Sequence, residues 1–359
     1  MNDYELWFAN ANLSYMVKLK LLNKFKSVEK IWYYSIQNKK DNIFNTKMIS
    51  ALEKAWDKNK INFIKEKLVN EDIKTVVITD KLYPERLKVY EDSPYMLFYK
   101  GDIKKINYEH NVAVVGAREC TNYGANVTNL ICQHLCKNNI NIISGLARGI
   151  DTLAHSKCIN MNSYTCAVLG SGIDVVYPKQ NLNLYHDISK NGCIISQFMP
   201  GIKPFSYNFP IRNRIISALS DLVIVIEGNE KSGSLITASS ALDQGKDVIA
   251  VPGNVFSQQS KGTNKLIKDG AYVFTEIKDI YDILNIQDIK QPHIISSKMS
   301  CIEKEVYENI GNTPVHIDQI INLTQIDIRK LYEVLFDLKL KEQVICLSGN
   351  YYVRNNNKI

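Results

Sequence analysis

The sequence predicts an α/β protein with a core of parallel strands, a small helical domain before this core and a winged-helix domain after it. The chain has 359 residues, which suggests two to three domains. In its middle, short apolar runs rich in β-branched residues alternate with helical stretches, as in parallel strands joined by crossover helices. The end of the chain reads as three helices followed by a β-ribbon.

The composition is that of a globular protein. Apolar residues make up 45% and charged residues 23% of the chain, which excludes wholesale disorder. No apolar run reaches the ~18 residues of a membrane-spanning helix, and Met1–Asn12 lacks the basic start of a signal peptide. We therefore expect a cytoplasmic protein without a membrane partner. The net charge of +7 permits a polyanionic partner but does not require one.

The eight cysteines form no Cys-x-x-Cys pair and none has zinc-type spacing to a histidine. We expect buried thiols, with no metal site and no cofactor.

Residues 1–75 read as a helical domain, because Leu19, Leu22, Phe25 and Val28 recur at helical spacing. The stretch Met1–Glu66 carries 12 basic and 7 acidic residues. An accessory contact with nucleic acid is one interpretation of this charge, and a solvated lysine-rich surface is the favoured one.

Residues 76–285 form the predicted parallel-sheet domain. Its strands are Val112–Val115, Ile142–Ser144, Ala167–Leu169, Ile194–Ser196, Leu222–Ile226 and Val248–Val251. Glycine closely follows five of them, at Gly116, Gly145, Gly170, Gly228 and Gly253. Ligands of open α/β sheets bind beyond the carboxyl ends of the strands, where glycine permits close approach of the backbone. We therefore place the site in a glycine-rimmed crevice at this edge.

Residues 296–354 read as the winged-helix domain. The predicted helices are Cys301–Ile310, Ile317–Ile321 and Asp327–Leu340, and the ribbon ends in Tyr351–Val353. A DNA-reading helix is expected to be basic, but this segment carries seven basic and eight acidic residues. A protein-contact or regulatory role is therefore favoured over DNA reading.

The first two turns of the crevice combine glycine with arginine. Arg118 follows Gly116 ahead of a helix that begins near Gly124, where backbone N–H groups favour an anion and the guanidinium could clamp a phosphate. A tight turn with a surface arginine explains the same residues. The second turn, Ser144–Asp151, offers Asp151 as a helix N-cap. His155 lies one turn later without a nucleophile, so a structural role is favoured.

The next turns add an aromatic ring and further cations. Gly170 and Gly172 lead to Lys179 at the same rim. A dense cluster follows, consisting of Phe209, Arg212, Asn213 and Arg214 in a chain with only seven arginines. Phosphate contacts plus base stacking are typical of single-strand binding. The alternative is that these arginines are merely solvated at a helix start.

A last turn contains Lys231, Ser232, Gly233 and Ser234 before a helix predicted over Leu235–Gln244. Small and hydroxyl residues at a helix N-terminus suit a phosphate. Four such turns at one edge indicate a ligand with several phosphates, and a polymer rather than a mononucleotide.

Taken together, these motifs resemble the DNA-processing protein A (DprA/Smf) family between about Tyr83 and Thr275. The residues that carry the resemblance stand in family order: Gly116-Ala117-Arg118, Ser144–Asp151 with His155, Gly170–Lys179, Phe209–Arg214, Ser232–Ala238 and Val251-Pro252-Gly253. Upstream, Tyr83-Pro84 and Asp92-Ser93-Pro94 also match the lead-in of the family. The two terminal segments are similar to its helical N-terminal domain, of the SAM or helix-hairpin-helix type, and to its winged-helix domain.

The resemblance implies an extended Rossmann domain that binds single-stranded DNA without cutting it. Members of the family dimerise through this domain and help to load the RecA recombinase during transformation or recombination. Position by position, Arg118, Lys179 and the cluster Arg212–Arg214 would hold phosphates, while Phe209 and Ser232–Ser234 would shape the pocket. Two residues depart from the pattern: Ala117 stands where serine is common, and Gln197 where glutamate is common.

Two other functions compete with this interpretation. The first is a nucleotide-hydrolysing enzyme similar to the LOG-type phosphoribohydrolases, which carry a catalytic glutamate after their glycine turn. Here the stretch from Ser232 to Ala241 contains no acid, although glycosidic hydrolysis needs a carboxylate or an equivalent base. The second is a winged-helix transcription regulator, which the acidic third helix disfavours.

Overall fold

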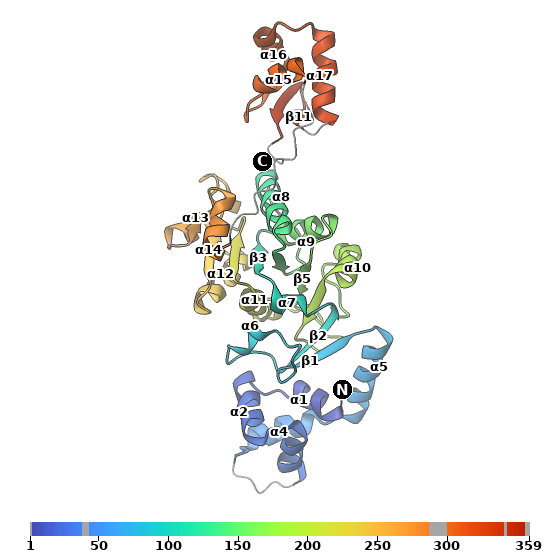
Figure 1. The fold of residues 1–359 in the computed structure, drawn as a ribbon. Coiled ribbons are helices and arrows are strands. Elements are labelled where there is room, and N and C mark those ends of the chain that lie inside the picture. The colour runs from blue at the N-terminus through green and yellow to red at the C-terminus, as the bar shows by residue number, and fades with distance from the viewer. Residues whose placement is uncertain (1, 38–42, 287–299, 341–342, 356–359) are drawn as a thin grey trace. The chain divides into compact units, whose positions relative to one another are not determined.

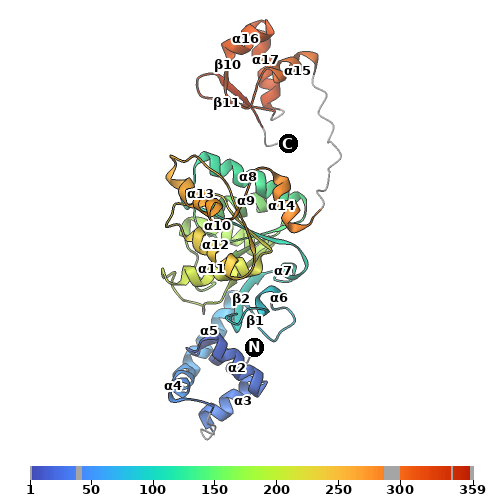
Figure 2. The same ribbon diagram turned by 90° about the vertical axis from the view of Figure 1, so that its left-hand side faces the viewer.

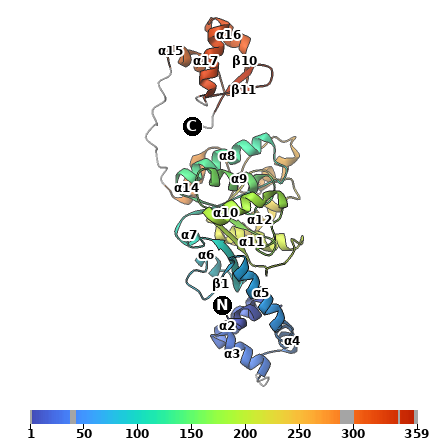
Figure 3. The ribbon, with the colours of Figure 1, turned by 90° about the vertical axis from the view of Figure 1, so that its right-hand side faces the viewer.

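The computed structural model describes residues 2–37, 43–286, 300–340 and 343–355. The chain divides into two compact units, an N-terminal unit of residues 1–288 and a C-terminal unit of residues 289–359. Figures 1, 2 and 3 show the elements of each unit from three sides. No helix among the described residues is long and apolar enough to span a membrane.

The N-terminal unit begins with helices, as the apolar spacing predicts. They are α1 (Asp3–Asn10), α2 (Tyr15–Phe25), α3 (Val28–Trp32), α4 (Thr46–Ala55) and α5 (Lys58–Asn70), with a π-helical turn at Tyr33–Gln37. Each α-helix starts where a side chain satisfies a free backbone N–H group. The capping residues are Asn2, Ser14, Ser27, Asn45 and Asp57.

A nine-stranded sheet follows, in the order β1-β2-β6-β5-β4-β3-β7-β8-β9. The strands are β1 (Lys74–Val77), β2 (Met96–Gly101), β3 (Asn111–Val115), β4 (Asn141–Ser144), β5 (Thr165–Val168), β6 (Cys193–Ser196), β7 (Leu222–Val225), β8 (Asp247–Ala250) and β9 (Tyr272–Val273). Strands β3 to β9 pair in parallel, whereas β2 is antiparallel to both β1 and β6. The six predicted parallel strands are confirmed, and β1, β2 and β9 were not predicted.

Helices cover both faces of this sheet (Figures 1 and 2). Alternate residues of β3 point to opposite faces, so Val112 and Val114 pack with α8 (Asn122–Lys137), α9 (Ile150–Asn160) and α14 (Ile277–Leu284). Their neighbours Ala113 and Val115 pack with α11 (Asn208–Leu219) and α12 (Gly233–Asp243). The remaining helices of the unit are α6 (Glu85–Lys88), α7 (Lys105–Tyr108), α10 (Leu182–Asn191) and α13 (Lys261–Lys268), with 3-10 turns at Lys179–Asn181 and Gln258–Ser260. The extended Rossmann-type core is thus confirmed.

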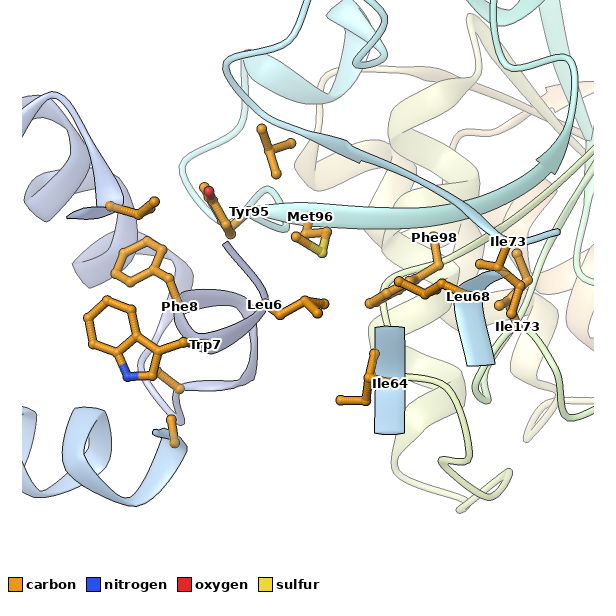
Figure 4. Packing of buried hydrophobic residues seen from close by; sticks show 14 of the residues in the cluster. Leu6, Trp7, Phe8, Ile64, Leu68, Ile73, Tyr95, Met96, Phe98 and Ile173 are labelled. Atoms are coloured by element: carbon orange, nitrogen blue, oxygen red, sulfur yellow. The ribbon is translucent and has the colours of Figure 1, made fainter. Parts of the chain in front are cut away.

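The N-terminal helices share a hydrophobic core with one end of the sheet (Figure 4). Leu6, Trp7 and Phe8 of α1 join Tyr95, and the Phe8 and Tyr95 rings meet edge to face with centroids 4.9 Å apart. The sequence predicts a boundary at residue 75, but the two sides of that position form one compact unit. The division into three domains therefore stays a prediction.

The C-terminal unit contains α15 (Cys301–Glu308), α16 (Ile317–Thr324) and α17 (Ile328–Leu340), with a three-stranded antiparallel sheet. Its strands are β10 (Val315–His316), β11 (Val344–Leu347) and β12 (Tyr351–Arg354), in the order β10-β12-β11. A separate core that includes Val306, Ile320 and Leu335 holds it together. This is the predicted winged helix, with β10 as an additional short strand.

The cysteines that the structure describes are free thiols. As expected, Cys132, Cys136, Cys158, Cys166 and Cys193 are buried. The prediction of burial is wrong for Cys346, which lies exposed on β11, and Cys120 is only half-buried. Within the described residues, no group of three or more His, Cys, Asp or Glu side chains could hold a metal ion.

Candidate nucleic-acid interface

A cavity of about 660 Å³ opens beside the carboxyl ends of β3, β4 and β7, where the sequence places the site. We call this cavity the crevice. Its lining comes from the turns after β3 and β4, from the start of α11 and from the start of α12. A smaller pocket adjoins it and shares Arg118, Arg148, Phe209 and Arg212 with it. Glycines and charged, polar or aromatic side chains of the lining include Gly116, Arg118, Arg148, Asp151, Tyr177, Phe209, Arg212, Asn213, Lys231, Ser232, Gly233 and Ser234.

Phe209 stands at the centre of the arginine cluster. The guanidinium carbon atoms of Arg118 and Arg212 lie 5.6 and 5.7 Å from the centroid of its ring, within range of cation–π attraction. The Tyr177 ring lies 5.9 Å from the same centroid. Arg118 and Arg148 are exposed, and among the described residues neither forms an ion pair. The crevice therefore offers two exposed guanidinium groups, and that of Arg118 lies beside an aromatic ring.

Arg212 differs from these two arginines, because its side chain is only 5% exposed. Its Nη1 atom donates hydrogen bonds to the carbonyl oxygens of Gly145 (2.6 Å) and Val168, and Nε donates to Asn213 Oδ1 at 3.0 Å. Burial lowers the pKa of its guanidinium to about 10, and nearby Asp151 opposes this change. Arg212 thus joins the ends of β4 and β5. Its predicted role as a phosphate ligand stays a prediction.

Two of the predicted glycines are required by this packing. A Cβ atom on Gly145 would lie 2.7 Å from the guanidinium carbon of Arg212, and one on Gly170 would lie 2.8 Å from the Phe209 ring. Both distances are shorter than real contacts allow. These glycines therefore make room for the side chains of Arg212 and Phe209.

Asp151 does not have its predicted role. Helix α9 begins at Ile150 with Gly149 as its N-cap, so Asp151 lies inside the first turn. Its Oδ2 atom accepts hydrogen bonds from the backbone N–H groups of Gly145 (3.1 Å) and Ala147 (3.3 Å). The N-cap prediction is wrong because the carboxylate folds back onto the preceding turn. Burial raises the pKa of Asp151, against the opposing effect of the Arg212 charge.

His155 is fully buried, and its Nδ1 atom lies 2.8 Å from Thr165 Oγ1 in a hydrogen bond. Burial lowers the pKa of the imidazole to about 3, so the ring is neutral at pH 7. The structural role that the sequence favours for His155 is confirmed.

The start of α12 closes another side of the crevice. Ser232 is the N-cap of this helix, and its Oγ atom accepts from the backbone N–H group of Ser234 at 3.3 Å. Asn213 holds the turn in place by donating from Nδ2 to the Gly233 carbonyl oxygen at 3.1 Å. Lys231 is exposed beside it. The turn presents a helix N-terminus and one lysine to the cavity, which suits an anion.

Five predicted site residues are not among those that line the crevice, and two of them, Gly145 and Gly170, line the smaller adjoining pocket instead. Lys179 is exposed on the 3-10 turn that begins with it, and Gly172 packs against Asp174 and Met199. Arg214 forms an ion pair with Asp92. Conversely, Arg148 and Tyr177 line the crevice without having been predicted as site residues, although both lie inside motifs of the predicted turns.

The two departures from the family pattern lie in different places. Ala117 lines the crevice, where serine would add a hydroxyl group. Gln197 lines a second cavity, where its side chain hydrogen-bonds the Tyr15 hydroxyl group.

Comparison with known proteins decides the family. Residues 74–285 match the family model described as DNA recombination-mediator protein A. The chain belongs to the DprA/Smf family. Residues 300–350 also match the model of the DprA winged helix domain.

Individual members are similar over most of their length. DNA processing protein DprA of Bacillus subtilis is 41% identical over 218 residues, which cover 61% of this chain and 73% of the relative. Protein Smf of Escherichia coli is 33% identical over 280 residues, or 76% of this chain and 75% of the relative.

Two solved structures share the fold. DprA from Streptococcus pneumoniae superposes with a TM-score of 0.68 at 33% identity, covering 79% of this chain and 98% of that one. DprA from Helicobacter pylori has a TM-score of 0.54 at 29% identity, covering 59% and 95%. The Helicobacter pylori protein is described as having a unique single-stranded DNA binding mode.

Proposed function

We propose that this chain is a recombination mediator that binds single-stranded DNA in the crevice without cutting it. One observation carries the proposal: Phe209 lies beside the exposed Arg118 in the lining of the crevice. An aromatic face accepts any base by stacking, and free guanidinium groups accept phosphates. The single-stranded DNA binding of the Helicobacter pylori relative supports the same ligand.

Two carboxylates line the crevice, those of Asp151 and Glu119. The buried Asp151 carboxylate already accepts two backbone hydrogen bonds on one oxygen. Glu119 is exposed at the rim. A general base must reach the proton that it removes, so the Asp151 oxygen that already accepts two backbone hydrogen bonds is a poor candidate for this task.

The proposal includes two partners. RecA recombinase would receive the bound strand, as the recombination-mediator description of the matching family suggests. A homodimer would form through the Rossmann domain. Analytical ultracentrifugation tests the dimer, and transfer of a labelled strand from this protein to RecA tests the mediator step.

Binding is tested by fluorescence anisotropy with a labelled oligonucleotide and a duplex of equal length, over a series of salt concentrations. We expect preference for the single strand and an affinity that falls as salt rises. Arg118→Ala and Arg148→Ala should each weaken binding about tenfold or more, because each removes a charge-assisted contact.

Arg214→Ala is the matched control, since Arg214 is a nearby arginine paired with Asp92. Equal affinity of the wild type for both DNA forms, or release of a base from a nucleoside monophosphate, would contradict the proposal. Equal losses in the Arg118 and Arg214 variants would show that general charge, not the crevice, holds the strand.

A further inference from the structure

A stacked aromatic pair lies on residues 204–208, a segment that borders the crevice. The rings of Phe205 and Tyr207 are 5.4 Å apart between centroids and inclined by only 7°. Their exposed fractions are 45% and 64%, so both rings offer surface to solvent. Their neighbours Pro204 and Ser206 line the crevice, which places the pair directly beside it. Exposed parallel rings beside a nucleic-acid site are suited to stacking a further base.

The same segment also borders the second cavity, which has a volume of about 390 Å³. Tyr207 and Asn208 line this cavity, together with Gln197, with Asn12 from the loop between α1 and α2, and with Lys18 from α2. The segment therefore borders both cavities, and Tyr207 of the aromatic pair lines the second one. The volume and the amide-rich lining fit a small polar group such as a nucleotide.

The second cavity is lined by a buried lysine, Lys18. Its side chain is 4% exposed, and among the described residues it pairs with no carboxylate. The ammonium group donates to the Ala9 carbonyl oxygen at 2.7 Å and lies 5.8 Å from the centroid of the Phe8 ring. An ammonium group has three donors, so this single hydrogen bond leaves donors for a ligand.

The position of Lys18 in its helix favours an anion as well. The residue lies near the start of α2, where the N-terminal end of the helix dipole disfavours a cation. Burial lowers the pKa of its ammonium group to about 7. An anion in the cavity would compensate both effects.

We propose that the second cavity, with the Phe205–Tyr207 pair at its mouth, is a further nucleotide subsite for the strand held in the crevice. A base of that strand stacks on the aromatic pair, and the adjoining phosphate pairs with the Lys18 ammonium group. This subsite rests on the proposed binding of single-stranded DNA. It makes the N-terminal helices part of the DNA-binding surface.

The subsite predicts that affinity depends on strand length. A thymidine oligonucleotide of about 5 nucleotides fills the crevice alone, whereas one of about 20 nucleotides reaches both sites. The double variant Phe205→Ala/Tyr207→Ala and the single variant Lys18→Met should each weaken binding of the long strand about tenfold. Neither change should alter affinity for the short strand.

Phe256→Ala is the control, because Phe256 is 91% exposed and lines neither cavity. Tryptophan fluorescence gives a second measurement, since Trp7 and Trp32 lie in α1 and α3 and Trp56 lies between α4 and α5. The long strand should change this emission in the wild type but not in the Lys18 variant.

Unchanged affinity for the long strand in both variants, with a wild type that binds, would overturn the subsite and leave the proposed function standing. A wild type that binds neither strand would overturn both. Equal losses for short and long strands would also overturn the subsite, because they would indicate general damage to the crevice.

Discussion

Arg212 and Lys18 are both cations buried in the N-terminal unit, but their surroundings differ. Arg212 donates to two carbonyl oxygens and to Asn213, with Asp151 nearby. Lys18 donates to one carbonyl oxygen and has no carboxylate beside it among the described residues. Burial lowers both pKa values, to about 10 for Arg212 and about 7 for Lys18. A buried charge is tolerated when its donors are used, and it destabilises when they are not.

The largest effect is expected at Arg212. Arg212→Met leaves the Gly145 and Val168 carbonyl oxygens without their donor and removes the charge beside Asp151. Breaking a buried charged contact costs about 3–5 kcal/mol, so urea unfolding should show a loss of this size. The midpoint should fall without a change of slope. A variant as stable as the wild type would show that the two carbonyl oxygens do not depend on Arg212.

Lys18→Met should act in the opposite direction. Replacing a poorly compensated buried charge with an apolar side chain of similar volume stabilises by about 1–4 kcal/mol. The variant should therefore unfold at higher urea concentration at pH 7, even though it binds the long DNA strand less well. A destabilised variant would contradict the comparison.

The difference in stability between the wild type and Lys18→Met should depend on pH. The pKa of Lys18 is about 7 in the folded chain and 10.5 ordinarily, so the unfolded chain binds more protons between these values. Wild-type stability relative to Lys18→Met should therefore rise as pH increases from about 7 to about 10. Urea titrations of both proteins at several pH values measure the gap, which should close toward the alkaline end. A constant gap would mean that Lys18 does not titrate as a buried amine.

Gly170→Ala should lower the free energy of unfolding by less than Arg212→Met does. The added Cβ atom would lie 2.8 Å from the Phe209 ring, which is in cation–π contact with Arg212. Overpacking of this kind costs about 1–3 kcal/mol, and the displaced ring should also weaken DNA binding. Thermal unfolding and anisotropy measure the two effects. Gly311→Ala is the control, because its Cβ atom would meet nothing closer than 3.8 Å.

The smallest effect is expected for a cation on the surface. Lys330 on α17 pairs with Glu333 at 2.8 Å, and both side chains are exposed. Lys330→Ala should leave the unfolding midpoint unchanged within error, because exposed ion pairs contribute little. Single-strand affinity should also stay the same, since the slightly acidic winged helix is expected to contact protein. A clear loss of affinity would assign DNA contacts to α17.

The sequence predicts the central parallel strands but not β1, β2 and β9, which lie toward the two edges of the sheet. All six central strands were predicted because both faces of these strands are buried, which produces continuous apolar runs. Strand β9 has only two residues, both exposed, and β1 mixes exposed with buried positions, so neither leaves such a run. The antiparallel strand β2 has a buried apolar run, but the two strands that it pairs with, β1 and β6, lie far apart from each other in the sequence.

For the candidate site, the sequence predicts which turns meet but not how their side chains are used. Arg118, Phe209 and Ser232 do line one cavity. The burial of Arg212 could not be predicted, because its acceptors Gly145 and Val168 lie 67 and 44 residues earlier in the chain. The cavity at Lys18 could not be predicted either, because helix α2 and the segment near Gln197 are distant in the sequence and come together only in the folded chain.

The shared core of the N-terminal helices has a consequence for the order of folding during synthesis. Leu6, Trp7 and Phe8 belong to the same buried cluster as Ile194 of β6. At translation rates of about 5–20 residues per second, the ribosome makes β6 on the order of ten seconds or more after α1. The first helices therefore wait with part of their apolar surface uncovered until β2 and β6 pair. A nascent chain arrested before residue 193 should be more sensitive to protease in its first seventy residues than one arrested after residue 288.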